Sequence, residues 1–172
     1  MKYLALIVTA FIMLAAVSFA DSIVIEIIEF DCSAQPSLFS EYSKSLNKHD
    51  PANQLSVYEK LKSSELPKKI LLQYRQVLPD NHQITQTTEL NGAEFELETR
   101  DADQSGLMNL KLGYSTQLGD TELRNSKQTE MVMVYGDTLI IPSIESTGQT
   151  ANDEVIETRT ITMTRIEIEI TG

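Results

Sequence analysis

Apolar residues follow different spacings in successive parts of this chain. Residues 23–30 are β-branched and almost continuously apolar, which predicts a strand that is largely buried. Apolar residues then recur every three or four positions in 37–46 and 51–63, which predicts two short helices. Asp50 and Pro51 are typical of the N-cap and the first position of a helix, so they mark where the second helix begins.

Segment 70–78 fits two interpretations. Apolar residues at positions 70, 72 and 74 follow the spacing of a strand, whereas those at 70, 74, 77 and 78 follow the spacing of a helix. Pro79 would end either element. We interpret the segment as a strand, with a helix as the alternative.

From residue 83 onward the apolar spacing becomes two. Segments 84–90 and 93–99 alternate on either side of Asn91-Gly92, a dipeptide that suits a two-residue type I′ turn and therefore predicts a hairpin. This turn would place Thr88 opposite Phe95 on the inner face.

The alternation continues through 108–114, which predicts a half-buried strand. Segments 131–135 and 139–141 flank Gly136-Asp137 and predict a second hairpin, followed by a polar loop at about 145–153.

The last apolar stretch changes phase. Ile161 and Met163 are in one phase, whereas the isoleucines that follow from Ile166 are in the other, which predicts a bulge near Thr164-Arg165. The end of this stretch is similar in character to residues 23–27, so we expect the two terminal strands to pair in the centre of one sheet.

These patterns predict one α+β domain over residues 21–172. Its sheet is expected to be mainly antiparallel or mixed, with one or two short helices near the N-terminus. The length of 172 residues suits a single domain, and no internal repeat indicates a second one.

Residues 1–20 have the pattern of a secretory signal peptide. Lys2 precedes an apolar run at 4–17, and small residues occupy positions 18 and 20. The alternative is a membrane anchor, but the run is shorter than the roughly 20 residues that cross a bilayer, and Asp21 follows directly. We expect cleavage after Ala20 and export to the periplasm or cell envelope of a bacterium.

The net charge of −11 excludes one class of partner. Nucleic-acid binding needs clustered Lys and Arg, whereas this chain has 14 basic and 25 acidic residues and a pI near 4.6. Loss of Lys2 with the leader would make the net charge −12. We therefore expect no nucleic acid partner and at most peripheral contact with membranes.

Cys32 is the only cysteine, so an intramolecular disulfide is impossible. We expect a buried thiol that behaves as a small apolar side chain. An intermolecular disulfide and a reactive thiol are the alternatives.

The chain lacks recognisable catalytic and cofactor motifs. Neither His49 nor His82 has a second metal ligand at helical or hairpin spacing, and a nucleophilic pair of either with Cys32 has no supporting context. Four glutamates alternate with apolar residues and are interpreted as a solvated face rather than an acid–base pair: Glu26, Glu94, Glu96 and Glu98. We predict a protein that is not an enzyme, with no catalytic, cofactor-binding or metal-binding residue.

The loop from Asp101 to Gly106 has the opening pattern of a calcium loop, with oxygen-bearing side chains at its first, third and fifth positions. Leu112 occupies the twelfth position, where such a loop needs a bidentate Glu. An acidic turn is therefore preferred over a cation site.

Residues 86–94 contain a Thr-Thr pair followed by Asn91-Gly92, and 95–114, 129–144 and 160–170 continue as strand segments. In this order they resemble the β-domain of secretins, the ring-forming outer-membrane proteins of bacterial secretion and pilus systems. The strand and helices at the start are similar to the region that precedes that domain.

Two departures from the secretin pattern bear on what the resemblance implies. Pro142-Ser143 stand where the family has paired glycines, and 145–153 replace the gate segment. The resemblance therefore implies a small secretin-like domain without a gate, which would not conduct anything by itself.

We expect a non-catalytic interaction module of the envelope, associated with protein secretion or pilus assembly, whose exposed strand edges bind a protein partner. A periplasmic binder of small ligands is the alternative, with a cavity lined by Phe95, Leu110 and Tyr114. A hydrolase of unknown type is the least favoured. The sequence indicates neither the partner nor the oligomeric state.

Overall fold

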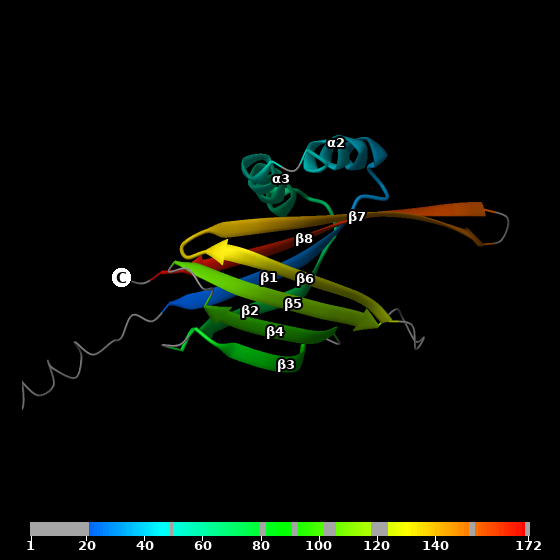
Figure 1. Ribbon diagram of the computed structural model, residues 1–172. Helices are drawn as coiled ribbons and strands as arrows, with labels where there is room; N and C mark the ends of the chain where they lie inside the picture. Colours follow the sequence, from blue (N-terminus) through cyan, green and yellow to red (C-terminus); the bar gives the residue numbers. More distant parts are fainter. Residues whose placement is uncertain are drawn as a thin grey trace, which may run out of the picture.

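The computed structural model describes residues 21–170 apart from 49, 80–81, 91–92, 102–105, 118–123 and 152–153. Two helices and eight strands are present in these residues, in the following order (Figure 1): β1 (Ser22–Asp31), α2 (Pro36–Leu46), α3 (Pro51–Ser63), β2 (Lys68–Val77), β3 (Ile84–Leu90), β4 (Ala93–Asp101), β5 (Leu107–Gln117), β6 (Arg124–Val134), β7 (Thr138–Ala151) and β8 (Glu154–Glu169).

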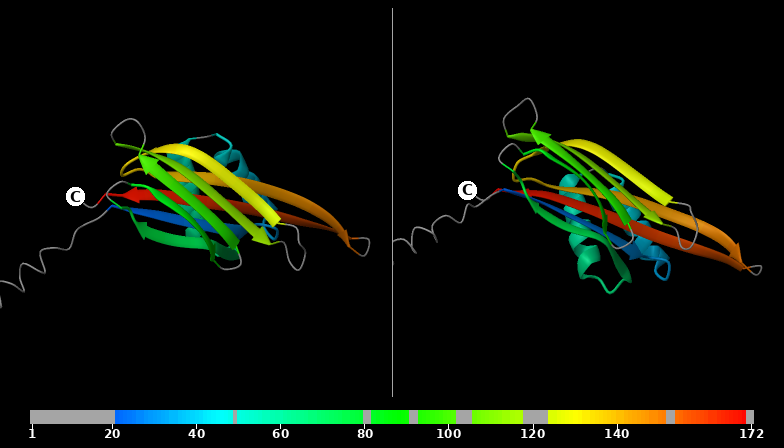
Figure 2. Two further views of the ribbon diagram at one scale, coloured as in Figure 1. Left: turned by 60° about the horizontal axis from the view of Figure 1, so that its bottom comes forward. Right: turned by 90° about the horizontal axis from the view of Figure 1, so that it is seen from below.

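The elements form three layers. A central sheet has the strand order β2-β1-β8-β7, and an outer sheet has the order β3-β4-β5-β6. Every strand pair in both sheets is antiparallel. The two helices cover the face of the central sheet that points away from the outer sheet (Figures 1 and 2). The predicted α+β class, with mainly antiparallel sheet and helices near the N-terminus, is confirmed.

Strands β1 and β8 lie at the centre of the central sheet. They pair from Ser22 opposite Glu169 to Asp31 opposite Thr160, which confirms the expected pairing of the terminal strands. Side chains on one face of β1, from Ile23 to Ile27, enter the core between the sheets, whereas Ile28 and others enter the core beneath the helices. Burial on both faces explains why β1 is almost continuously apolar.

The predicted bulge in β8 is wrong. The pairing of β8 with β1 and with β7 runs through Thr164-Arg165 without a shift. Ile161 and Met163 face the helices, whereas Ile166 and Ile168 face the outer sheet. The change of phase therefore marks the point along β8 where the buried apolar side chains switch from the face beneath the helices to the face beneath the outer sheet.

Both helices and β2 lie close to where the sequence places them. The Asp50 side chain accepts a hydrogen bond of 3.1 Å from the Ala52 amide, and Pro51 is the first residue of α3, so the predicted helix start is confirmed. Segment 70–78 forms part of β2 and then leaves the strand after Val77, which confirms the strand interpretation.

The first predicted hairpin is confirmed in its strands. Thr88 pairs with Phe95, and the last pair before the turn is Leu90 with Ala93. The turn itself, Asn91-Gly92, lies outside the described residues.

The second predicted hairpin is wrong, because β6 and β7 belong to different sheets. Gly136, with a φ of +86°, takes the chain from one sheet to the other, and its amide donates to Ile168 O at 3.0 Å. The Asp137 amide donates to Val134 O at 3.2 Å and tightens the same turn. Alternation predicted two strands correctly, but it carries no information about which strand each one pairs with.

The polar loop predicted at 145–153 is also wrong. Strand β7 continues to Ala151, and β8 begins at Glu154. Residues 146–148 of this segment are exposed, and polar Ser and Thr are compatible with an exposed strand.

The crossover at Gly136 generates a stability prediction. Replacing Gly136 by Val places a β-branched side chain at a positive φ and should destabilise the fold by about 1–3 kcal/mol. Asn tolerates this conformation better, so Gly136→Asn should lose less. Urea unfolding of both variants checks this; equal midpoints for wild type and Gly136→Val would contradict it.

Candidate functional site

A first candidate surface is the outer part of the β7–β8 hairpin, which we call the ribbon and define as residues 146–151 and 154–159. These two segments pair with each other, whereas β1 stops pairing with β8 at Asp31, opposite Thr160. Among the described residues, no third strand pairs with the ribbon, and it projects beyond the rest of the molecule (Figure 1).

The base of the ribbon is fixed to the end of β1. The Cys32 amide donates to Arg159 O at 2.8 Å, and the Arg159 amide donates to the Ser33 hydroxyl at 3.0 Å. The ribbon is therefore held at a defined position where it leaves the sheet, which suits an element that presents its backbone to another chain.

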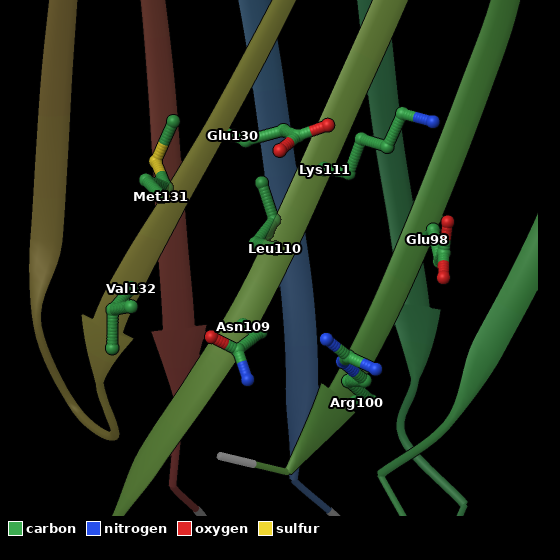
Figure 3. Close-up of a pocket in the computed structure, with 8 residues that line it drawn as sticks. All are labelled: Glu98, Arg100, Asn109, Leu110, Lys111, Glu130, Met131 and Val132. Atoms are coloured by element: carbon green, nitrogen blue, oxygen red, sulfur yellow. The ribbon is translucent and has the colours of Figure 1, made fainter.

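The second exposed feature is the outward face of the outer sheet. A concavity of about 450 Å³ lies over β4, β5 and β6 (Figure 3). Cross-strand neighbours line it in two rows, Glu98–Lys111–Glu130 and Arg100–Asn109–Val132. Its polar groups are charges and one amide, without a hydroxyl or thiol nucleophile among the lining residues.

Three of the four alternating glutamates lie on this solvated side, as predicted. Glu94 and Glu96 are exposed and Glu98 is half-buried. Glu26 is different, because it is only 5% exposed. The interpretation of Glu26 as part of a solvated face is therefore wrong: α3 covers that face of β1, which periodicity in β1 alone could not reveal.

Glu26 binds three side chains beneath α3. The Tyr58 hydroxyl donates to its carboxylate, Lys62 Nζ lies 2.8 Å from Oε2, and Gln73 Nε2 donates to Oε1 at 3.0 Å. These contacts join β1 to α3 and to β2.

The pKa shifts in this cluster favour fixed protonation states. Burial by itself would raise the pKa of Glu26, but the hydrogen bonds from Lys62, Tyr58 and Gln73 outweigh it and lower the pKa. Burial and the bond to Glu26 raise the pKa of Tyr58 to about 12, and the bond to Glu26 raises the pKa of Lys62. An ionised Glu beside a protonated Tyr and Lys stabilises the fold and is not suited to exchange protons near neutral pH.

A second polar cluster lies beside Asp21, just before the start of β1, and the sequence analysis did not predict it. His82 Nδ1 is 3.0 Å from Asp101 Oδ1, and its Nε2 is 3.8 Å from Asp21 Oδ2. The Tyr135 hydroxyl donates to Asp101 at 2.5 Å, and the rings of His82 and Tyr135 are 5.0 Å apart. These residues come from four distant parts of the chain, so no local spacing connects them.

This cluster is a junction between elements. The hydrogen bond from Tyr135 is the main cause of the lowered pKa of Asp101. Burial is the main cause of the raised pKa of Tyr135, and the hydrogen bond to Asp101 raises it further. Both ring nitrogens of His82 face carboxylates, and no group of three metal-ligating side chains gathers among the described residues. Residues 102–105 lie outside the described residues, so only Asp101 and Gly106 of the candidate calcium loop can be placed.

Cys32 is fully buried in the core beneath the helices, as predicted. Burial raises the pKa of its thiol, and the nearby Asp31 carboxylate raises it further. Cys32 follows the last residue of β1, whereas His82 lies beside Asp21 at the other end of that strand, roughly 30 Å away at about 3.3 Å per residue. The two do not form a nucleophilic pair, and His49 lies outside the described residues.

No protein-family model matches the sequence, and no curated protein matches it either. In the part of the chain that the structure describes, neither helix has the length and apolar character needed to cross a bilayer. The candidate site is therefore defined by geometry alone: the ribbon, the strand edges and the outward face of the outer sheet.

Replacing Glu26 by Gln should destabilise the fold by about 1–3 kcal/mol at neutral pH, mainly through weaker hydrogen bonds. Lys62 is 44% exposed, so solvent screens its ion pair and that part of the loss is small. Because the folded pKa of Glu26 lies below 4.5, this stabilisation is present above about pH 4.5 and is lost as the pH falls through the folded value.

Urea unfolding between about pH 3 and 7 checks this, with the exposed Glu96→Gln as the matched control. Glu96→Gln should leave the stability nearly unchanged. Equal stability of the two variants at pH 7 would contradict the assignment.

The buried Cys32 thiol should react slowly with dithionitrobenzoate in the native protein, roughly 100-fold more slowly than in urea. In a Cys32→Ser background, a cysteine placed at the exposed Ser40 should react at once and serves as the positive control. Non-reducing gels of the wild type should show a monomer. Rapid native labelling, or a dimer band that Cys32→Ser removes, would refute a structural thiol.

Proposed function

We propose that this protein is a non-catalytic interaction module, exported to the bacterial periplasm or cell envelope, that binds a protein partner through exposed strand edges. The observation that carries the proposal is the ribbon, which extends past the end of β1 and, beyond Arg159, has no third strand paired with either of its sides among the described residues.

The stability of a two-stranded ribbon supports this function. Such ribbons are marginal in water by themselves and gain stability when a third strand or a packing surface is added. Strand addition supplies main-chain hydrogen bonds whatever the sequence, and side chains at alternate positions then provide specificity. A ribbon that is fixed at Arg159, and that pairs with no third strand in the described residues beyond it, suits this mode of binding.

The association with secretion or pilus assembly rests on the secretin resemblance and the leader pattern. Segment 145–153 stands where the resemblance would place the gate, and most of it belongs to the ribbon. A secretin-like domain that presents a ribbon in this position would contact a neighbouring chain rather than close a channel.

The small-ligand alternative receives less support. It required a cavity lined by Phe95, Leu110 and Tyr114, but Phe95 and Leu110 are 0% and 2% exposed and pack in the core between the sheets. The Tyr114 side chain lies outside the described residues. The concavity over the outer sheet is open and charged, unlike the enclosed apolar pockets that hold most small ligands.

Site-specific photocrosslinking in the source cells tests the proposal. A photoreactive benzoylphenylalanine at Ser146 or Thr158, both exposed on the ribbon, should yield a discrete adduct with another envelope protein, identified by mass spectrometry. Lys60, exposed on α3, is the matched control and should yield none. Adducts with secretion or pilus components would support that association, and the absence of any ribbon adduct would refute the function.

A further inference from the structure

The chain passes between the two sheets twice, after β2 and after β6. His82 lies in the first of these connections, and Tyr135 lies in the second. Their rings are 5.0 Å apart, and both side chains contact Asp101, the last residue of β4. The polar cluster around His82 therefore joins the two places where the chain links the outer sheet to the central sheet.

Main-chain hydrogen bonds hold both connections against the central sheet. The Leu78 amide donates to Asp21 O at 2.7 Å, and the Gly136 amide donates to Ile168 O at 3.0 Å. The outer sheet holds the first connection as well, since the Thr99 hydroxyl donates to His82 O at 2.9 Å. The first connection is thus tied to both sheets through its backbone.

His82 has an unusual backbone conformation. Its φ is +48°, and among the described residues it is the only one besides glycines with a positive φ. This left-handed region is uncommon for residues with a side chain, although His and Asn adopt it more readily than most. Such a conformation persists where the surrounding contacts require it, and it often accompanies function.

The two ring nitrogens of His82 face carboxylates from different sheets. Nδ1 lies 3.0 Å from Oδ1 of Asp101 in the outer sheet, and Nε2 lies 3.8 Å from Oδ2 of Asp21, directly before the first strand of the central sheet. A neutral imidazole has one N–H, so it donates to one carboxylate only. A protonated imidazole has two N–H groups and a positive charge, so it attracts both carboxylates.

We propose that His82 is a pH-sensitive lock between the two sheets, in which protonation of its ring adds an attraction to Asp21 and holds the outer sheet more firmly. Histidine ordinarily takes up its proton between about pH 8 and 5, where aspartate carboxylates stay ionised. The hydrogen bond from Tyr135 and the contact with His82 both lower the pKa of Asp101, which keeps this partner of the ring ionised. Tyr135, which also lies against the ring, has a raised pKa and stays a neutral donor.

The direction of the pH effect follows from these contacts. In the folded protein the protonated ring lies between two carboxylates that are distant in the unfolded chain. The stabilisation is therefore present while the ring is protonated and is lost as the pH rises and the ring loses its proton. The side chains of His82 and Asp21 are each 26% exposed and that of Asp101 is 53% exposed, so solvent screens part of the attraction.

Urea unfolding at about pH 8 and about pH 5.5 tests the lock, with His82→Asn as the variant. Asn tolerates a positive φ and takes up no proton, so the comparison isolates protonation of the ring. On lowering the pH, the folding equilibrium constant of the wild type should rise roughly 3- to 5-fold more than that of His82→Asn, and less in high salt. The chain has one other histidine, so His49→Asn is the matched control and should keep the wild-type pH profile.

A second variant separates a lock from a contact that is merely structural. Asp21→Asn keeps polar atoms near Nε2 but removes the charge, so the gain in stability at low pH should shrink. Hydrogen exchange locates the effect in the fold. In the wild type, protection of the Leu78 and Gly136 amides relative to their unfolded rates should rise at low pH, and in His82→Asn it should not.

Three results would each overturn the lock: equal pH profiles of the wild type and His82→Asn, loss of the profile in His49→Asn, or an unchanged profile in Asp21→Asn. The Asp21→Asn comparison still decides where His82→Asn does not fold.

This inference goes beyond the proposed function and does not rest on it. The ribbon lies at the start of β8, whereas the bond from Gly136 to Ile168 lies near the end of that strand. Crosslinking at the ribbon and the pH profile therefore report different parts of the molecule, and failure of one leaves the other standing.

Discussion

The pairing of β1 with β8 is the constraint on which the rest of the structure depends. Both strands present buried apolar side chains on their two faces, with Ile23 and Ile166 on one side and Phe30 and Ile161 on the other. One covering layer would leave one of these sets in water. The helices supply one layer and the outer sheet supplies the other, so the three-layer architecture follows from a central pair that needs cover on both sides.

Because both faces of β1 are covered, Glu26 is buried and needs hydrogen-bond partners. It lies on the face of β1 that α3 covers, where an unpaired carboxylate would be strongly destabilising. Tyr58, Lys62 and Gln73 supply the hydrogen bonds, and they come from α3 and β2. The polar cluster therefore fixes the position of the helix layer, while apolar burial provides most of the driving force.

Periodicity predicted the elements better than their partners. It placed β1, both helices and the β3–β4 pair, because each depends on local spacing or, for the hairpin, on the short separation between Leu90 and Ala93, which pair with each other. It failed at Gly136-Asp137, where a short connection crosses between sheets, and in 145–153, where a polar strand is indistinguishable from a loop. The His82 cluster was out of reach for the same reason, since its members meet only through tertiary structure.

The crossover at Gly136 links the fold to the candidate site. Had Gly136-Asp137 joined β6 and β7 as a hairpin, each would have paired with the other and neither would be an edge. Because the chain instead changes sheet, both strands end as edges, and β8 has only β7 beside it beyond Thr160. The crossover therefore leaves β6 at the edge of the outer sheet and β7 at the edge of the central sheet, and the ribbon adds to this because β7 and β8 continue past the end of β1. A fold that closed its sheets there would place β6 beside β7 and leave less of the strand edge through which we propose that this protein binds another chain.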